Sequence, residues 1–356
     1  MNLYKTYLLL LACLCLGLSL NGQDVQFTQF YNNRSYLNPA LTGLEQGLTL
    51  SAAYRNQWAN VPGGGYETAF ASIEQSEPYL RSSFGLSFFR STAGIAKLTY
   101  QEANLLYAYA IPMFAKKTAK ERMLHIGFRL GVGQRSVNWN DLVFSDQLDP
   151  VFGIVNPTAA IPIRNNSLFF DIGAGAAFRW DNKLFNKDCR SMIGISAQHI
   201  TQQDESMQGI ETRRPIRLTA HVGTEIPILA VGMNGKRKVT ICPNIKYDYQ
   251  KGIQIFNYGF FLTYESVYMG AFYANKHPGI DPVNTNSIIG IFGYGGNIGG
   301  SNNKWHLTYS VDGNTGGFGA NGRGTHELQM RINFGDAQLI KGKSAKRNGM
   351  KCHTFF

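Results

Sequence analysis

The sequence has no long apolar segment after its first 22 residues, which excludes a helical membrane protein. The apolar stretch from Tyr7 to Leu20 is shorter than the roughly 20 residues that cross a bilayer as a helix. It follows Lys5 and ends at Asn21-Gly22, a pattern typical of a secretory signal peptide. We therefore expect residues 1–22 to be a Sec signal that is cleaved near Gly22.

Cysteine is scarce, with five residues in the chain. Cys13 and Cys15 lie in the expected signal, where Cys13 only faintly matches a lipoprotein cleavage site. The other three, Cys189, Cys242 and Cys352, show no CxxC or Cys/His spacing. Three scattered cysteines exclude a disulfide framework and indicate no zinc site. We expect two small apolar fillers and one thiol in the tail.

The motifs that carry catalysis or phosphate binding are also missing. The sequence contains no GxGxxG, GxxxxGK[ST], HExxH or GxSxG. The glycine-dense segment 293–300 lacks the spacing of a phosphate loop, and the two acids of 145–150 are too few for a calcium site. We therefore predict no enzyme, no catalytic residue, no cofactor and no metal.

The mature chain is basic but does not resemble a nucleic-acid-binding protein. The whole sequence has 34 Lys and Arg against 23 Asp and Glu, a formal net charge of +11. An exported chain without a zinc-finger, helix-turn-helix or RNA-recognition pattern is unlike proteins that bind nucleic acid. The distribution of the positive charge is more informative than its total.

What the sequence does contain is strict alternation of apolar and polar residues. In 124–133, apolar residues alternate with His125, Gly127, Arg129 and Gly131, a period of two that indicates a strand. Turn residues separate the alternating segments. Fourteen such segments are expected, near 47–58, 65–75, 83–91, 98–111, 124–133, 168–180, 191–200, 217–226, 238–249, 253–264, 267–274, 286–294, 304–311 and 327–334.

An even number of strands in an exported chain predicts a transmembrane antiparallel β-barrel over residues 47–335. Closure of the sheet pairs every backbone group, which the hydrocarbon layer demands. A soluble sandwich of fourteen strands would need two cores or covering helices, and the sequence indicates neither. Outer-membrane barrels keep their termini and short turns in the periplasm. The four longest expected loops, 139–167, 201–216, 275–285 and 312–326, all fall on the opposite, outer side.

This orientation places many basic residues on the periplasmic side, in turns and in the tail 336–356. We predict an electropositive rim that binds an acidic periplasmic partner, although solvated turns are commonly charged without such a role. The candidate residues are Lys116, Lys117, Lys236, Arg237, Lys238, Lys341, Lys343, Lys346 and Arg347.

The segment 23–46 precedes the first expected strand and does not alternate like one. It is rich in aromatic residues, and Asn38-Pro39 has the form of a helix cap followed by a proline in the first turn. We expect a leader that plugs the lumen or lies across the periplasmic mouth. A flexible leader is the alternative, but its aromatic content is unusual for a solvated tail.

Several motifs resemble those of the PorP/SprF family of Bacteroidetes outer-membrane proteins, which are linked to type IX secretion and gliding motility. The start of the expected mature chain, QDVQFTQFYNNRSYLNPALTG, is similar to the family's N-terminal motif, which ends in L-N-P-A-x-x-G. Further similar segments, which extend the resemblance from about residue 23 to the end, are YRNQW (54–58), GISAQHITQQ (194–203), YSVDGN (309–314) and GTHELQMRINF (324–334). The tail CHTFF departs from the family, which more often has proline after the cysteine.

The resemblance implies a non-enzymatic outer-membrane component of a secretion and motility machine. Its expected partners are a secreted adhesin or its C-terminal sorting domain, and a periplasmic ring lipoprotein or peptidoglycan-binding protein, besides outer-membrane lipid. We expect Asn38 and Pro39 to shape the leader, and His326 and Glu327 to fix the last strand or the barrel closure. The alternative function is a passive channel for small or hydrophobic solutes, because barrels of this size often transport.

Overall fold

The structure is a computed structural model that describes residues 24–59, 61, 64–113, 122–159, 164–184, 187–207, 211–231, 237–277, 286–299, 302–315, 324–337 and 339. The side chains of 184, 187–188, 229–231 and 237–238 are outside this description. The expected signal, 1–22, and nearly all of the basic tail also lie outside the described residues.

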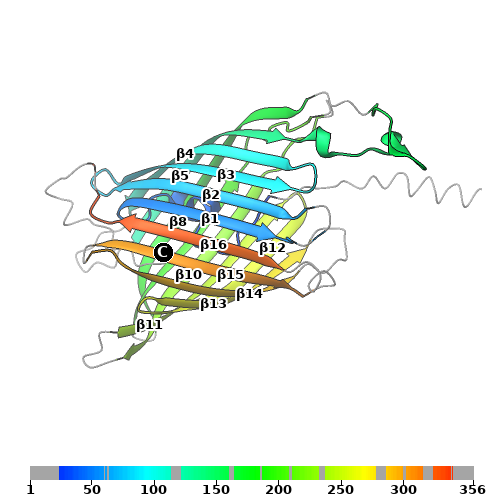
Figure 1. Cartoon of the computed structure of the whole chain (residues 1–356). Coiled ribbons are helices and arrows are strands. Elements are labelled where there is room, and N and C mark those ends of the chain that lie inside the picture. The colour runs from blue at the N-terminus through cyan, green and yellow to red at the C-terminus, as the bar shows by residue number, and fades with distance from the viewer. Residues whose placement is uncertain are drawn as a thin grey trace, which may run out of the picture.

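Fourteen antiparallel strands form one closed barrel, as the alternation predicts (Figure 1). Each strand pairs with its neighbours in chain order, and β1 pairs with β16 to close the sheet. The strands are β1 (Gly47–Gln57), β2 (Tyr66–Glu77), β3 (Ser82–Ala93), β4 (Leu98–Pro112), β5 (Arg122–Ser136), β8 (Asn166–Leu184), β9 (Lys187–Gln198), β10 (Arg217–Val231), β11 (Arg237–Gln250), β12 (Ile253–Tyr264), β13 (Val267–His277), β14 (Ser287–Asn297), β15 (Asn303–Asn314) and β16 (Thr325–Phe334).

The two faces of the strands are the inverse of those in a water-soluble sheet. In β1 the side chains of Thr49 and Arg55 point into the barrel and are buried, whereas Tyr54 points outward and is 47% exposed. In β5 the outward residues Phe128 and Leu130 are exposed and the inward Arg129 is buried. Apolar residues outside and polar residues inside are the arrangement of a transmembrane barrel.

The two longest connections lie at the same end of the barrel, as the sequence predicts, although that end also has the short turns 94–97 and 251–252. The barrel sequence begins at Gly47 and ends at Phe334. Leu48 pairs with Phe334 across the β1–β16 seam, so both ends of this sequence lie at the same end of the barrel. Turns at that end include 78–81 and 265–266, whereas the opposite end has the long connections 137–165 and 199–216. We call these the inner and the outer end.

The sequence did not predict structure within the longest outer connection. Its elements are η2 (Trp139–Asp141), η3 (Ser145–Gln147), β6 (Leu148–Asp149) and β7 (Gly153–Ile154), the last two forming a short hairpin. This connection extends away from the outer end of the barrel, in green in Figure 1. Among the described residues, no helix is long and apolar enough to cross a membrane.

The segment 24–46 lies inside the barrel, and we call it the plug. It contains α2 (Arg34–Leu37) and η1 (Pro39–Leu41), and most of its residues are buried. Asp24 contacts the outer ends of β10 and β11, and Gln46 contacts Asn333 near the inner end of β16. The plug therefore runs the length of the lumen from the outer end to the inner end.

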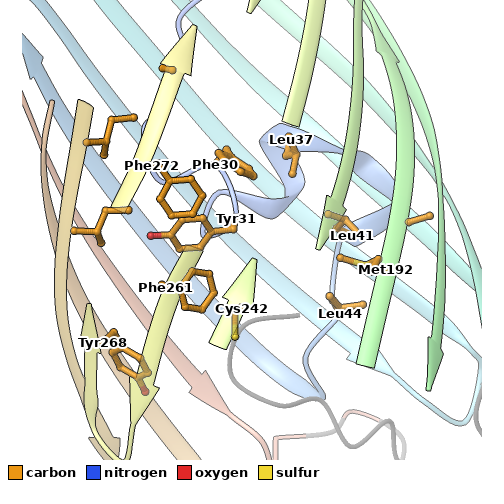
Figure 2. Packing of buried hydrophobic residues seen from close by; sticks show 14 of the residues in the cluster. Phe30, Tyr31, Leu37, Leu41, Leu44, Met192, Cys242, Phe261, Tyr268 and Phe272 are labelled. Carbon is orange, nitrogen blue, oxygen red and sulfur yellow. The ribbon is translucent and has the colours of Figure 1, made fainter. Parts of the chain in front are cut away.

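Aromatic packing holds the middle of the plug against the wall formed by β11–β14. Figure 2 shows Tyr31 between Phe261 and Phe272, with ring centroids 5.0 and 5.7 Å away. Phe30 meets Phe272 edge-on at 5.9 Å. Burial of large aromatic side chains and such ring pairs contribute strongly to packing, so this part of the lumen is a core rather than a channel.

Candidate functional site

The plug turn at Asn38 sits in a recess of the barrel wall that glycines create. A Cβ at Gly127 of β5 would lie 2.3 Å from the backbone nitrogen of Ala40, and a Cβ at Gly175 of β8 would lie 2.0 Å from Oδ1 of Asn38. At Gly194 of β9, a Cβ would lie 3.0 Å from Nδ2 of Asn38. Three neighbouring strands thus omit side chains where the plug approaches most closely.

Asn38 uses its whole amide group in this recess and is fully buried. Its oxygen accepts the backbone N–H of Ala40 at 2.9 Å, which caps η1, with Pro39 as the first helical residue. Its nitrogen donates to the carbonyl oxygens of Ala176 and Ile195, both at 3.1 Å. Asn38 therefore shapes the plug and joins it to β8 and β9 at the same time.

Glu327 of β16 is the main anchor of the outer half of the plug. Its side chain is completely buried and accepts the backbone N–H groups of Thr28 at 2.7 Å and Gln29 at 3.1 Å. Arg55 of β1 pairs with Glu327 at 3.1 Å and with Asp312 of β15 at 3.3 Å. The plug is thereby fastened to both strands of the closing seam.

His326 lies on the other face of the same strand and has a different role. Its Nδ1 is 2.6 Å from the hydroxyl of Tyr309, and the two rings stack at 6.0 Å on the outward side of the barrel. The adjacent residues His326 and Glu327 thus point to opposite faces, as period two requires. Glu327, on the inward face, contacts the plug.

A cluster of charges surrounds Asp24 at the outer end of the lumen. Asp24 lies 2.6 Å from Nη2 of Arg214, 3.4 Å from Nη1 of Arg217 and 2.7 Å from Nε2 of His199. Burial alone would lower the pKa of Arg214, but Asp24, together with Tyr100 and Glu205, raises it well above its usual range. Removal of one partner from such a buried pair leaves an uncompensated charge, which is strongly destabilising.

A second charge cluster holds the inner half of the plug. Glu45 lies 2.9 Å from Arg34 in the plug and 3.4 Å from Arg331 of β16. In the outer half of the plug, by contrast, Lys246 of β11 donates to Gln26 at 2.6 Å. The two clusters and the glycine recess together fasten the plug at its outer end, its middle and its inner end.

The candidate basic rim lies almost wholly outside the described residues. Lys116, Lys117, Lys236, Lys341, Lys343, Lys346 and Arg347 belong to segments that the structure does not describe. The backbone of Arg237 and Lys238 begins β11 at the inner end of the barrel. The predicted rim therefore stays a prediction.

Two features of the site could not be predicted from the sequence. The recess glycines look in sequence like other glycines of a crowded barrel wall. They are needed because the plug, more than eighty residues away in the sequence, packs against them. The outer cluster depends on Arg214 and Glu205, which lie in a loop without periodicity. A usable signal was present for inward charges such as Arg129 and Asp171, since charge on the polar face of a strand points into the lumen.

The profile of the type IX secretion system membrane proteins PorP/SprF matches residues 19–332 of this sequence. The chain belongs to the PorP/SprF family. As a PorP/SprF protein with a closed barrel, it is an outer-membrane component of the type IX secretion machinery. No curated protein matches the sequence.

Solved structures resemble this PorP/SprF protein only as barrels. CdiB from Acinetobacter baumannii has a TM-score of 0.43 and 9% identity over 81% of this chain and 60% of that chain, so the chain spans about 60% of the length of CdiB. The P. putida toluene transporter TodX has a TM-score of 0.37 and 11% identity over 83% and 90% of the two chains. The Acinetobacter baumannii outer membrane protein Omp33 has a TM-score of 0.36 and 8% identity over 82% and 100%.

Proposed function

We propose that this protein is a non-enzymatic docking scaffold that holds a secreted adhesin, or its C-terminal domain, at the outer loops. The observation that carries the proposal is the plug, which occupies the lumen from Asp24 to Gln46. Cavities between plug and wall measure about 10 Å³ each, at Asn32–Arg331 and at Tyr31–His221. Such a space holds at most about one water, so a filled lumen favours a scaffold over a conduit.

The long outer connection 137–165 supports binding at this end. Its hairpin carries Val151, 80% exposed, and Phe152, 78% exposed, followed by the exposed Ile154 and Val155. The side chain of Asp149 accepts the backbone N–H groups of both Val151 and Phe152, at 2.8 and 2.9 Å, which orders the tip. Large apolar side chains on an ordered, projecting tip are typical of a surface that binds another protein.

Two other roles have less support from the described residues. Linkage to a periplasmic ring or to a peptidoglycan-binding protein depends on the basic rim, which lies mostly outside them. A passive channel requires a path through the lumen, which the plug occupies. We therefore favour docking at the outer end.

The test is capture of partners from native outer membranes with the Phe152→Ser variant and with the wild type. We expect the variant to lose at least about 90% of the co-purified secreted adhesin while the barrel stays folded, because Phe152 contributes exposed apolar contact area and no barrel packing. Leu339→Ser, an equally exposed apolar residue at the inner end, is the matched control and should retain capture. Undiminished capture by Phe152→Ser together with Val151→Ser contradicts the proposal.

A further inference from the structure

The outward face of β1–β5 changes from apolar to polar near the outer end. Asn56 lies opposite Glu67, Arg90 lies opposite Gln101, and Gln101 donates to Gln134 at 2.8 Å. All five side chains occupy outward positions. Because hydrocarbon contacts an apolar surface, this polar band lies at the level of the lipid headgroups of the outer leaflet.

The polar band contains a cavity at the outer end of the barrel, where β1 and β3 end and β2 begins. A cavity of about 710 Å³ is lined by Tyr54, Asn56, Glu67, Arg90 and Lys97, among others. This volume is in the range of pockets that hold small molecules. The cavity opens toward the membrane side of the wall, not into the lumen.

Two cations in this cavity lack a carboxylate partner within the described part of the chain. Arg90 and Lys97 are both exposed, and neither forms an ion pair with a described acid, including Glu67 of the same cavity. Elsewhere in the barrel, arginines such as Arg55, Arg129 and Arg331 pair with carboxylates. The cavity lining, with two cations and one acid, thus has a net positive charge, and an arginine there can bind a phosphate through two parallel hydrogen bonds.

A second, apolar hollow lies directly below the polar one on the same wall. It has a volume of about 860 Å³ and is lined by Ala71, Ile73, Phe88, Leu105 and Val132, among others. Ala71 is the next outward residue after Ala69 on β2, and Phe88 is the next after Arg90 on β3. A cationic hollow above an apolar one matches an amphiphile with an anionic headgroup and acyl chains.

We infer that this wall is a binding site for a phosphorylated glycolipid of the outer leaflet. Arg90 and Lys97 bind the phosphate, and Asn56 and the carboxylate of Glu67 hydrogen-bond the sugar hydroxyls. Tyr54, which is 47% exposed, flanks the sugar from β1, and acyl chains fill the apolar hollow. Basic residues at a membrane surface each favour an anionic lipid by roughly fivefold.

The test measures binding of purified bisphosphorylated lipid A to the full-length protein in detergent, by native mass spectrometry. We expect the double variant Arg90→Gln, Lys97→Gln to bind at least about tenfold more weakly than the wild type. Lys251→Gln removes an exposed cation from the outer β11–β12 turn on another part of the wall, and should bind like the wild type. Heat-modifiable migration in gels confirms that each variant is a closed barrel.

Two further ligands distinguish the sources of the phosphate. Dephosphorylated lipid A should bind the wild type as weakly as bisphosphorylated lipid A binds the double variant, and phosphatidylglycerol should bind more weakly than bisphosphorylated lipid A. Equal binding of phosphatidylglycerol overturns the assignment to a glycolipid. Equal affinity of the wild type and the double variant, or equal loss in Lys251→Gln, overturns the site itself.

Discussion

The carboxylate of Glu327, in the last strand, accepts the backbone N–H of Thr28 at 2.7 Å, across 299 positions of sequence. Arg55 of the first strand pairs with the same carboxylate. The closing seam and the outer half of the plug therefore share one buried anchor, and the register of β1 with β16 continues unbroken from Leu48–Phe334 to Gln57–Thr325.

Glu327→Gln should destabilise the folded barrel. The change removes the charge that faces Arg55 and one of two strong acceptors for the plug backbone. We expect a loss of about 2–3 kcal/mol in the free energy of unfolding, below the full cost of breaking a buried pair, because Asp312 still faces Arg55. Urea unfolding in detergent micelles measures this free energy. His326→Gln on the outward face should change it by less than about 1 kcal/mol, and an equal loss in both variants would show that the plug contact is not the cause.

Gly175→Ala should displace the plug turn. The new Cβ would lie 2.0 Å from Oδ1 of Asn38, and overpacking of this kind costs about 1–3 kcal/mol. The same urea titration provides the measurement, with Gly290→Ala as the control because no atom lies within 4 Å of a Cβ there. Removing the clashing amide should relieve part of the cost, so Asn38→Ala with Gly175→Ala should be less destabilised than the sum of the single variants. If the losses of the two single variants simply added in the double variant, the cost of Gly175→Ala would not come from a clash with Asn38.

Asp24→Asn should loosen the outer end of the plug without unfolding the barrel. The substitution removes the negative charge between Arg214, Arg217 and His199, while the recess at Asn38 and the anchor at Glu327 are retained. We expect amide hydrogen exchange in residues 24–28 to accelerate at least about tenfold, since local opening follows the loss of buried partners. Exchange in 36–42 should stay unchanged. Uniform acceleration across 24–46 would show that the plug moves as one body.

The outer loop 199–216 should lose order in acid. The backbone N–H groups of Thr212 and Ser206 donate to Asp204 and hold its pKa below the usual 3.8. A carboxyl whose folded pKa is lowered contributes stability above its unfolded pKa and loses it as the pH falls through the folded value. Protection of the Thr212 amide, corrected for intrinsic exchange, should therefore hold from neutral pH to about pH 4 and fall below that. Asp204→Asn should show no such pH dependence. If protection of the Thr212 amide in the wild type does not fall below about pH 4, the Asp204 carboxylate does not order this loop.

The barrel could be predicted from the sequence because the alternation within each strand shows which residues face outward and which face the lumen. Leu328 and Met330 alternate with Glu327 and Gln329, and this local pattern fixes which residues face lipid. Chain export and loop lengths then determined the orientation. These are properties of short segments, which a single sequence displays.

The interior of the barrel could not be predicted because it depends on contacts between distant segments. Alternation places Glu327 and Arg55 on the inward face, but nothing near them in sequence indicates that Thr28 is the partner. Asn38 has the form of a helix cap in sequence, yet its second role depends on Gly175 and Gly194. The hairpin at 148–154 was missed because its strands are only two residues long each.

Conductance of the purified full-length protein in planar lipid bilayers shows whether the plug seals the lumen. We expect no steady conductance for the wild type. We expect ion-conducting openings for the variant Asp24→Lys with Glu327→Gln, in which the outer half of the plug is repelled from Arg214 and freed from β16. A steady open conductance of the wild type, unchanged in the variant, would contradict a sealed lumen and favour a passive channel.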